Sequence, residues 1–241
     1  MIYPRVKFRI SQVAELRTLK AFFHDVKYDN GRSLKWAIFR RHRELKNIIK
    51  NSSKLPLSQI IKYIRDVYKQ NNVHFLHDTI IVEKQWRKKE MPFFLLTKNL
   101  FPNLTWPKGK YIAYFTIWSM FPRFLDDKTF QIPFFHKKKG YINVIIAHEL
   151  LHFIFYKYFY KWYPQYRNPK YNYFVWNISE IFNILIQNSK PWIKEFNQKA
   201  LLYPEHKNIL SVLKNKLNKK TFIAKELTKY IVDEFKKRKW Q

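Results

Sequence analysis

Apolar residues recur every three to four positions over much of the chain, a spacing typical of helices that are buried along one face. This period predicts two helices in the N-terminal part, two long apolar helices in the middle and three amphipathic helices towards the C-terminus. The expected ranges are 34–50, 59–70, 141–162, 171–188, 193–202, 205–217 and 222–237. Residues 1–30 show only a weak pattern. Helices are therefore expected to dominate the fold.

Four shorter apolar stretches lack this period and predict β-strands. They cover residues 79–82, 93–96, 110–120 and 129–135. Pro133 favours an edge position for the last strand, because proline has no N–H group to donate to a neighbouring strand. Together these elements predict an α+β fold that is mostly helical, with a small mixed sheet and extra helices at both ends of the chain.

The length of 241 residues fits one or two domains. We divide the chain into an N-terminal region of helical and mixed character and unknown role, a core that carries the chemistry described below, and a C-terminal helical region. The ranges are 1–100, 101–190 and 191–241. We expect the three parts to form one compact unit overall.

The amino-acid composition excludes several classes of protein. The chain contains no cysteine and only three glycines. The absence of cysteine excludes a disulfide scaffold, a Cys-ligated metal centre and a thiol nucleophile. Neither G-x-G-x-x-G nor G-x-x-x-x-G-K-[ST] occurs, which disfavours dinucleotide-binding and P-loop enzymes.

The chain is strongly basic, with 47 Lys and Arg against 17 Asp and Glu and a formal net charge of +30. This charge favours contact with an anionic partner such as nucleic acid or an acidic protein, and the alternative interpretation is a set of solvated lysine-rich faces. Residues 1–20 lack the apolar segment of a signal peptide, and no uncharged apolar stretch is long enough for a transmembrane helix. We therefore expect a soluble, cytoplasmic protein.

The clearest chemical signal is the stretch His148-Glu149-Leu150-Leu151-His152, an H-E-x-x-H motif inside the predicted helix 141–162. Side chains four positions apart share one helical face, so the imidazoles of His148 and His152 can reach one metal ion. Glu149 lies about 100° around the helix from His148, beside a metal-bound water rather than on the metal. A catalytic zinc site has three protein ligands and one open position, so this motif requires a further ligand.

Glu180 is the candidate for that ligand. Glu149 and Glu180 are the only carboxylates in residues 128–194, and both lie in apolar helices, where an unpaired charge is costly. If helices 141–162 and 171–188 form an antiparallel pair, Glu180 lies level with the histidines, because both lie about 14–15 Å along their helices from the connecting loop. The sequence therefore predicts a site with two histidines and one glutamate, which suits a single Zn²⁺.

At these residues the sequence resembles the gluzincins, a group of zincin metallopeptidases with H-E-x-x-H on one helix and a glutamate ligand on a second. Trp176 and the stretch Ser179-Glu180-Ile181-Phe182 are similar to the W-x-x-N-E-x-F-A segment of gluzincin aminopeptidases. Ser179 and Asn183 depart from that segment, and no G-A-M-E-N-type motif occurs, so aminopeptidase specificity is not implied. The resemblance covers roughly residues 110–188.

The resemblance implies a zinc-dependent endopeptidase that hydrolyses peptide bonds. One Zn²⁺ is then held by His148, His152 and Glu180, and Glu149 activates the zinc-bound water. It also implies a zincin-like sheet packed on the active-site helix pair. The substrate is a peptide or protein.

In zincins an edge strand ahead of the active-site helix binds the substrate as an added antiparallel strand. The strand expected at 129–135 stands in that place, so by resemblance the residues that would bind substrate are Gln131, Ile132, Pro133 and Phe134.

Several supporting roles are expected near the metal. Asn183 or Asn177 could orient a zinc-bound imidazole through a hydrogen bond. The group that stabilises the oxyanion is left open by the sequence, and the candidates are Tyr163, Tyr173, Tyr203 and His206.

Three other interpretations stay open at this point. The histidines and Glu180 can be ordinary structural residues, or they can form a metal site without catalysis in an inactive zincin-like binding module. A third possibility keeps the same chemistry but recruits the protease to DNA or another polyanion through its basic surface.

Overall fold

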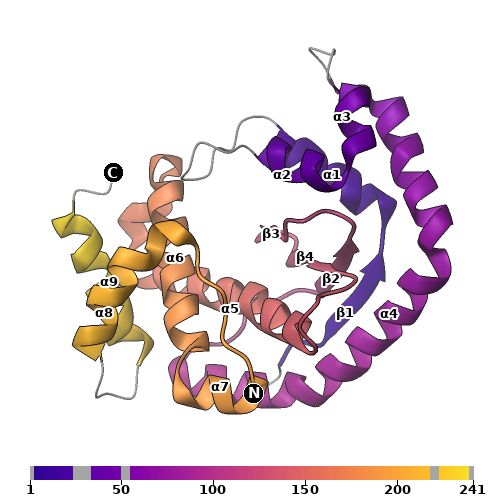
Figure 1. Cartoon of the computed structure of the whole chain (residues 1–241). Coiled ribbons are helices and arrows are strands. Elements are labelled where there is room, and N and C mark those ends of the chain that lie inside the picture. Colours follow the sequence, from indigo (N-terminus) through magenta and orange to yellow (C-terminus); the bar gives the residue numbers. More distant parts are fainter. Residues whose placement is uncertain (1–2, 24–33, 50–54, 218–222, 239–241) are drawn as a thin grey trace. The chain divides into compact units, whose positions relative to one another are not determined.

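The computed structural model describes residues 3–23, 34–49, 55–217 and 223–238. The chain divides into two compact units, whose elements are drawn in Figure 1. The helical unit comprises Met1–Pro4, Gln85–Gly109 and Lys138–Gln241, and the sheet unit comprises Arg5–Lys84 and Lys110–Lys137. Both units combine segments that are far apart in the sequence, whereas the sequence analysis divided the chain at residues 100 and 190.

The sheet unit contains a mixed sheet of four strands with the order β1-β2-β4-β3. The strands are β1 (Val6–Ile10), β2 (Tyr111–Thr116), β3 (Arg123–Phe124) and β4 (Thr129–Pro133). β1, β2 and β4 run parallel to one another, and β3 is antiparallel to β4. In β1 the side chains alternate between buried and exposed, as expected for a strand with one face on the core. The α+β fold with a small mixed sheet is thus confirmed.

The edge position expected for residues 129–135 is wrong. β2 pairs with β4 along one side, and on the other side β3 pairs with Thr129 and Phe130. The main-chain N–H of Gln131 donates to the carbonyl of Pro122 at 2.9 Å. Pro133 is tolerated because it is the last residue of the strand, opposite Thr116, beyond the pairing with β3.

Helix α1 (Gln12–Phe23) is attached to the end of β2 through a buried carboxylate, Glu15. Its Oε1 accepts hydrogen bonds from the Tyr68 hydroxyl at 2.6 Å and from the Ile117 N–H at 2.9 Å. Its Oε2 accepts one from the Thr116 hydroxyl at 2.7 Å. Burial raises the pKa of Glu15 to about 7, although these three hydrogen bonds favour the charged form. The carboxyl group is therefore half protonated near neutral pH.

We expect Glu15 to make the sheet unit less stable as the pH rises. Its folded pKa of about 7 lies above the ordinary value of 4.5, so its contribution to stability is complete below pH 4.5 and is lost as the pH passes 7. The Glu15→Gln variant mimics the neutral form. Between pH 4.5 and 8, the free energy of unfolding measured in urea should fall by about 3 kcal/mol more for the wild type than for this variant. Parallel pH profiles of the two proteins would contradict the assignment.

Helix α4 (Leu57–Leu100) runs from the sheet unit into the helical unit. It includes the stretches 79–82 and 93–96, so the strands expected there are wrong. Buried side chains such as Trp86 and Phe93 recur at helical intervals along α4. An apolar run of four residues has the same appearance in a buried strand and in one turn of a buried helix.

The helix expected at 34–50 is two helices, α2 (Leu34–Arg41) and α3 (Arg43–Ile49), which meet at His42. The Nδ1 atom of His42 lies 2.7 Å from the Tyr63 hydroxyl, and its Nε2 lies 3.1 Å from the Ile117 carbonyl oxygen. His42 also makes an edge contact with the ring of Trp118. These tertiary contacts hold His42 at the break between the two helices.

The helical unit is built around two long helices, α5 and α6, that lie beside each other. Two short 3₁₀ turns connect them, and in the described residues three further α-helices follow α6. The elements are α5 (Tyr141–Trp162), η1 (Pro164–Arg167), η2 (Pro169–Tyr171), α6 (Asn172–Gln187), α7 (Lys190–Phe196), η3 (Pro204–His206), α8 (Lys207–Leu217) and α9 (Ala224–Lys237).

Most helix ranges in this unit agree with the sequence analysis, and α5 covers the expected residues 141–162. The exception is α7, which was expected to extend to residue 202 but ends at Phe196, because Asn197 takes a left-handed conformation with φ 52°. Lys50 and Phe222, which two expected ranges include, lie outside the described residues.

Helices α5 and α6 are buried by aromatic contacts on several sides. Phe155 of α5 packs on Phe182 of α6 with ring centroids 4.7 Å apart, and Phe101 packs on Phe182 at 5.8 Å. Despite this apolar character, no helix in the described part of the chain is long and apolar enough to cross a membrane. The expected packing of the sheet on this helix pair stays a prediction.

Candidate metal centre

Polar side chains at three positions along α6 contact α5. The order of these contacts shows that the two helices run antiparallel. Gln187 donates from Nε2 to the Val144 carbonyl at 2.9 Å, and Asn183 donates from Nδ2 to the His148 carbonyl at 3.1 Å. One turn further along, Glu180 meets His148 and His152. This register is the one that the sequence predicts, in which Glu180 lies level with the two imidazoles.

The candidate ligand atoms of the three side chains, two imidazole nitrogens and the two oxygens of one carboxylate, lie close together. His148 Nε2 lies 3.0 Å from Glu180 Oε2, His152 Nε2 lies 3.3 Å from Glu180 Oε1, and the two Nε2 atoms are 3.1 Å apart. This group could hold a metal ion, because its ligand atoms all lie within 4.8 Å of one another. Glu149 is not a member of the group.

The spacing of these atoms suits a small divalent ion. Zinc bonds to nitrogen and oxygen are about 2.0–2.2 Å long, so neighbouring ligand atoms in a tetrahedral site are about 3.3–3.6 Å apart. The observed separations of 3.0, 3.1 and 3.3 Å lie at or slightly below this range. Two imidazoles and one carboxylate also match the donor preference of such ions.

Negative charge is concentrated at this point in an apolar environment. The side chain of Glu180 is 1% exposed, that of His152 is 0% exposed and that of His148 is 16% exposed. Burial lowers the pKa of His148, but the carboxylates of Glu180 and Glu149 together with the hydrogen bonds to Glu180 and Gln187 outweigh it, so the pKa is raised. The same negative charge favours a metal cation bound between the side chains.

Glu149 lies beside the group rather than in it. It follows His148 on α5, it is only 5% exposed, and its carboxylate is close enough to contribute to the raised pKa of His148. This position is consistent with the expectation that Glu149 is near the metal without being a ligand.

The two asparagines expected to orient an imidazole have other contacts. Asn183 donates to the main-chain carbonyl of His148 and not to its ring. Asn177 donates to the Tyr173 carbonyl at 2.9 Å, and its Oδ1 lies 2.8 Å from Nε2 of His206. In the described structure the hydrogen bonds of Asn183 and Asn177 thus involve main-chain atoms and His206.

Gln187 is the side chain that meets an imidazole of the group, and the sequence analysis did not single it out. Its Oε1 lies 2.8 Å from Nδ1 of His148. A signal for it was present, because Glu180, Asn183 and Gln187 are spaced by three and four residues and form a polar stripe on an apolar helix. All three are buried.

The candidates for oxyanion stabilisation lie in two places. Tyr163 stacks on Phe159 at the end of α5, with centroids 4.9 Å apart. The other three candidates pack around Trp176; they are Tyr173, Tyr203 and His206. The structure adds Tyr156, which lies one turn after His152 on α5 with its ring 6.3 Å from that imidazole.

The residues expected to bind substrate along a strand lie in the sheet unit, and each packs into its interior. Gln131 donates from Nε2 to the Ala14 carbonyl at 3.1 Å. Phe134 stacks on Phe75 with centroids 3.8 Å apart. Ile132 and Pro133 are buried as well. These contacts do not support the proposed role.

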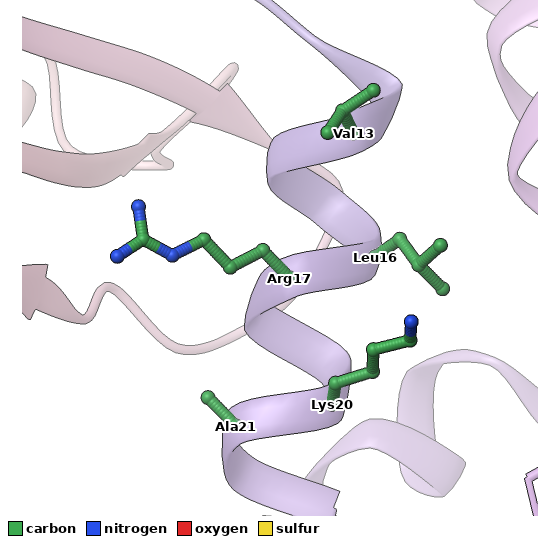
Figure 2. A pocket seen from close by; sticks show the side chains of 5 residues that line it. All are labelled: Val13, Leu16, Arg17, Lys20 and Ala21. Carbon is green, nitrogen blue, oxygen red and sulfur yellow. The ribbon is translucent and has the colours of Figure 1, made fainter.

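An open cavity of about 520 Å³ lies along α1 in the sheet unit (Figure 2), and no residue of the metal group lines it. Its lining comes from one helix and consists of Val13, Leu16, Arg17, Lys20 and Ala21. Arg17 is already engaged, since it pairs with Asp127 and lies over the Phe124 ring at 3.8 Å. The cavity brings together no set of groups with evident chemistry.

Comparisons with protein-family models, with curated proteins and with solved structures find no match for this chain.

Proposed function

We propose that this protein is a zinc-dependent peptidase with its metal bound by His148, His152 and Glu180. The observation that carries the proposal is the convergence of two imidazoles and a buried carboxylate on one point between α5 and α6. The sequence adds Glu149 between the two histidines, in the spacing of a metallopeptidase base. No cysteine is present to offer a thiol alternative.

His148, His152 and Glu180 would hold the zinc ion, which when bound would lower the pKa of a water molecule and polarise the scissile carbonyl. Glu149 takes one proton from the attacking water while the oxygen of that water bonds to the carbonyl carbon. When the C–N bond breaks, Glu149 returns this proton to the leaving amine. The second proton of the water passes from the new carboxyl group to the amine, so the products are a carboxylate and an ammonium group, and Glu149 is again ionised.

A second candidate function is a metal site without catalysis, in which the ion joins α5 to α6. The burial of the group favours it, because His152 and Glu180 are fully enclosed and Glu149 is nearly so. A catalytic zinc keeps a position open for water and substrate, and the partly exposed ring of His148 is the most accessible of the ligands. The two functions differ in whether any peptide is hydrolysed.

The formal charge of +30 favours a variant of the first function, in which the peptidase is held on DNA or another polyanion. Binding of this kind weakens steeply as the salt concentration rises. Binding to DNA that persists unchanged at high salt, or no binding at low salt, would contradict the proposal that the peptidase is held on DNA. Neither result would count against the metal site.

Elemental analysis of the purified protein, followed by digestion of a mixed peptide library, tests the proposal. We expect about one zinc per chain and cleavage that stops when a chelator removes the zinc and resumes when zinc is returned. Zinc at this level without cleavage of any peptide would favour the site without catalysis. A protein without affinity for zinc would overturn both functions.

A further inference from the structure

The side chain of Gln187 in α6 contacts α5 at two places, a main-chain carbonyl and the imidazole ring of His148. The Gln187 side chain is buried, with Nε2 2.9 Å from the Val144 carbonyl oxygen and Oε1 2.8 Å from Nδ1 of His148. Val144 and His148 are one helical turn apart, so the single amide spans one turn of α5.

The Val144 contact determines which way the amide points. A main-chain carbonyl can only accept a hydrogen bond, so the atom of Gln187 that faces it must be the NH₂ group. The reversed amide would place two acceptor oxygens 2.9 Å apart in a buried site, and it would leave both without a donor at that contact. The oxygen Oε1 therefore faces His148.

The orientation of the amide in turn determines the tautomer of His148. Oε1 can only accept, so Nδ1 of His148 must carry a hydrogen. In the neutral imidazole the other nitrogen, Nε2, then has a free electron pair. That nitrogen is the atom that lies 3.0 Å from Glu180 Oε2 and 3.1 Å from His152 Nε2.

We propose that Gln187 is a positioning residue of the metal centre, which holds His148 in the tautomer whose Nε2 electron pair faces the shared metal position. The inference rests on the proposed metal site and extends it to a residue outside the ligand set. A hydrogen bond from the far nitrogen of a metal-bound imidazole orients the ring, and its loss weakens metal binding by about 10- to 100-fold. Because Gln187 is neutral, it orients the ring without adding a further negative charge to Glu180 and Glu149.

Three variants separate this role from simple packing. Gln187→Leu keeps the approximate size but removes both hydrogen bonds. Gln187→Glu keeps an acceptor for Nδ1 of His148 and, with its carboxyl group protonated, a donor for the Val144 carbonyl. Asn188→Leu is the matched control, because Asn188 is the next residue of the chain and its amide donates to the Ala200 carbonyl at 3.2 Å instead. Zinc affinity is measured on each protein by competition with a chelator.

We expect Gln187→Leu to bind zinc about 10- to 100-fold more weakly, Gln187→Glu to recover most of the loss, and Asn188→Leu to stay within a few-fold of the wild type. A Gln187→Leu protein that melts like the wild type and binds zinc with wild-type affinity would overturn the proposal. If no variant and no wild-type protein binds zinc, the proposed metal site itself is wrong.

Nuclear magnetic resonance of zinc-loaded protein with ¹⁵N-labelled histidine gives a second readout that packing alone does not change. The wild type should show a slowly exchanging Nδ1–H proton on one zinc-bound imidazole, and this signal should exchange fast in Gln187→Leu. The wild-type spectrum decides the question even if the leucine variant does not fold. A zinc-bound His148 with its proton on Nε2 would contradict the inference.

Discussion

Replacing Glu180 by alanine should release the metal ion from the protein. The side chain supplies the only carboxylate in the group and lies 3.0 and 3.3 Å from the two imidazole nitrogens. Two histidines four residues apart on one helix bind zinc far more weakly without a third ligand, because three protein ligands are typical of such sites. We expect zinc affinity to fall by more than the roughly 100-fold limit seen for supporting residues around a metal.

Glu226→Ala is the matched control for this experiment. It makes the same chemical change in the same unit, at an exposed position in the first turn of α9. Elemental analysis after dialysis should find about one zinc per chain in the wild type and in Glu226→Ala, and almost none in Glu180→Ala. Full zinc occupancy in Glu180→Ala would show that this carboxylate is not a ligand.

Replacing Glu149 by glutamine should abolish hydrolysis and leave the metal in place. The amide has nearly the same shape as the carboxylate but cannot accept a proton from water at neutral pH. General-base catalysis contributes about 10²- to 10⁴-fold, so kcat for a cleaved peptide should fall by that factor. The zinc content should match that of the wild type, since Glu149 lies outside the ligand group.

The combination of the two readouts makes the Glu149→Gln result informative. Zinc retained with hydrolysis lost assigns the residue to proton transfer. Zinc lost from Glu149→Gln would mean that Glu149 binds or supports the ion. Unchanged hydrolysis in a zinc-loaded variant would mean that another group is the base, and Tyr156 beside His152 would be the next residue to test.

The helix pair that carries the site could be predicted from the sequence with little error. α5 and α6 are long and apolar, Pro164 follows α5 and Pro169 precedes α6, and the expected ranges agree with the observed ones to within one residue at each end. Their antiparallel pairing followed from the short connection, which left Glu180 at the same height as His148 and His152. Local pattern and chain geometry were enough here, because the ranges expected from the apolar period alone match the observed helices.

The parts of the fold that could not be predicted depend on contacts between distant segments. The run 93–96 had the appearance of a strand, and only its packing within α4 shows that it is helical. β1 is short and carries charges at alternate positions, so its role depends on pairing with β2, which lies about a hundred residues later. The break at His42 depends on tertiary contacts with Tyr63 and Ile117.

Within the candidate site, the convergence of His148, His152 and Glu180 could be predicted from the sequence, and the side chain that contacts the far nitrogen of His148 could not. A metal-binding pair on one helix has a fixed spacing that the sequence displays directly. The choice between Asn183 and Gln187 as partner of the His148 ring depends on side-chain length and on the height of each residue along α6. The shorter Asn183 reaches the main chain, whereas Gln187 lies one turn further on and meets Nδ1.

X-ray absorption spectroscopy of the zinc-loaded wild type, with Glu180→Ala measured alongside, tests most directly whether one ion lies among these three side chains. We expect two imidazole nitrogens and at least one carboxylate oxygen at about 2.0–2.2 Å in the wild type, and no comparable signal in Glu180→Ala. A wild-type spectrum that fits only water ligands, or one that Glu180→Ala reproduces, would contradict the shared site.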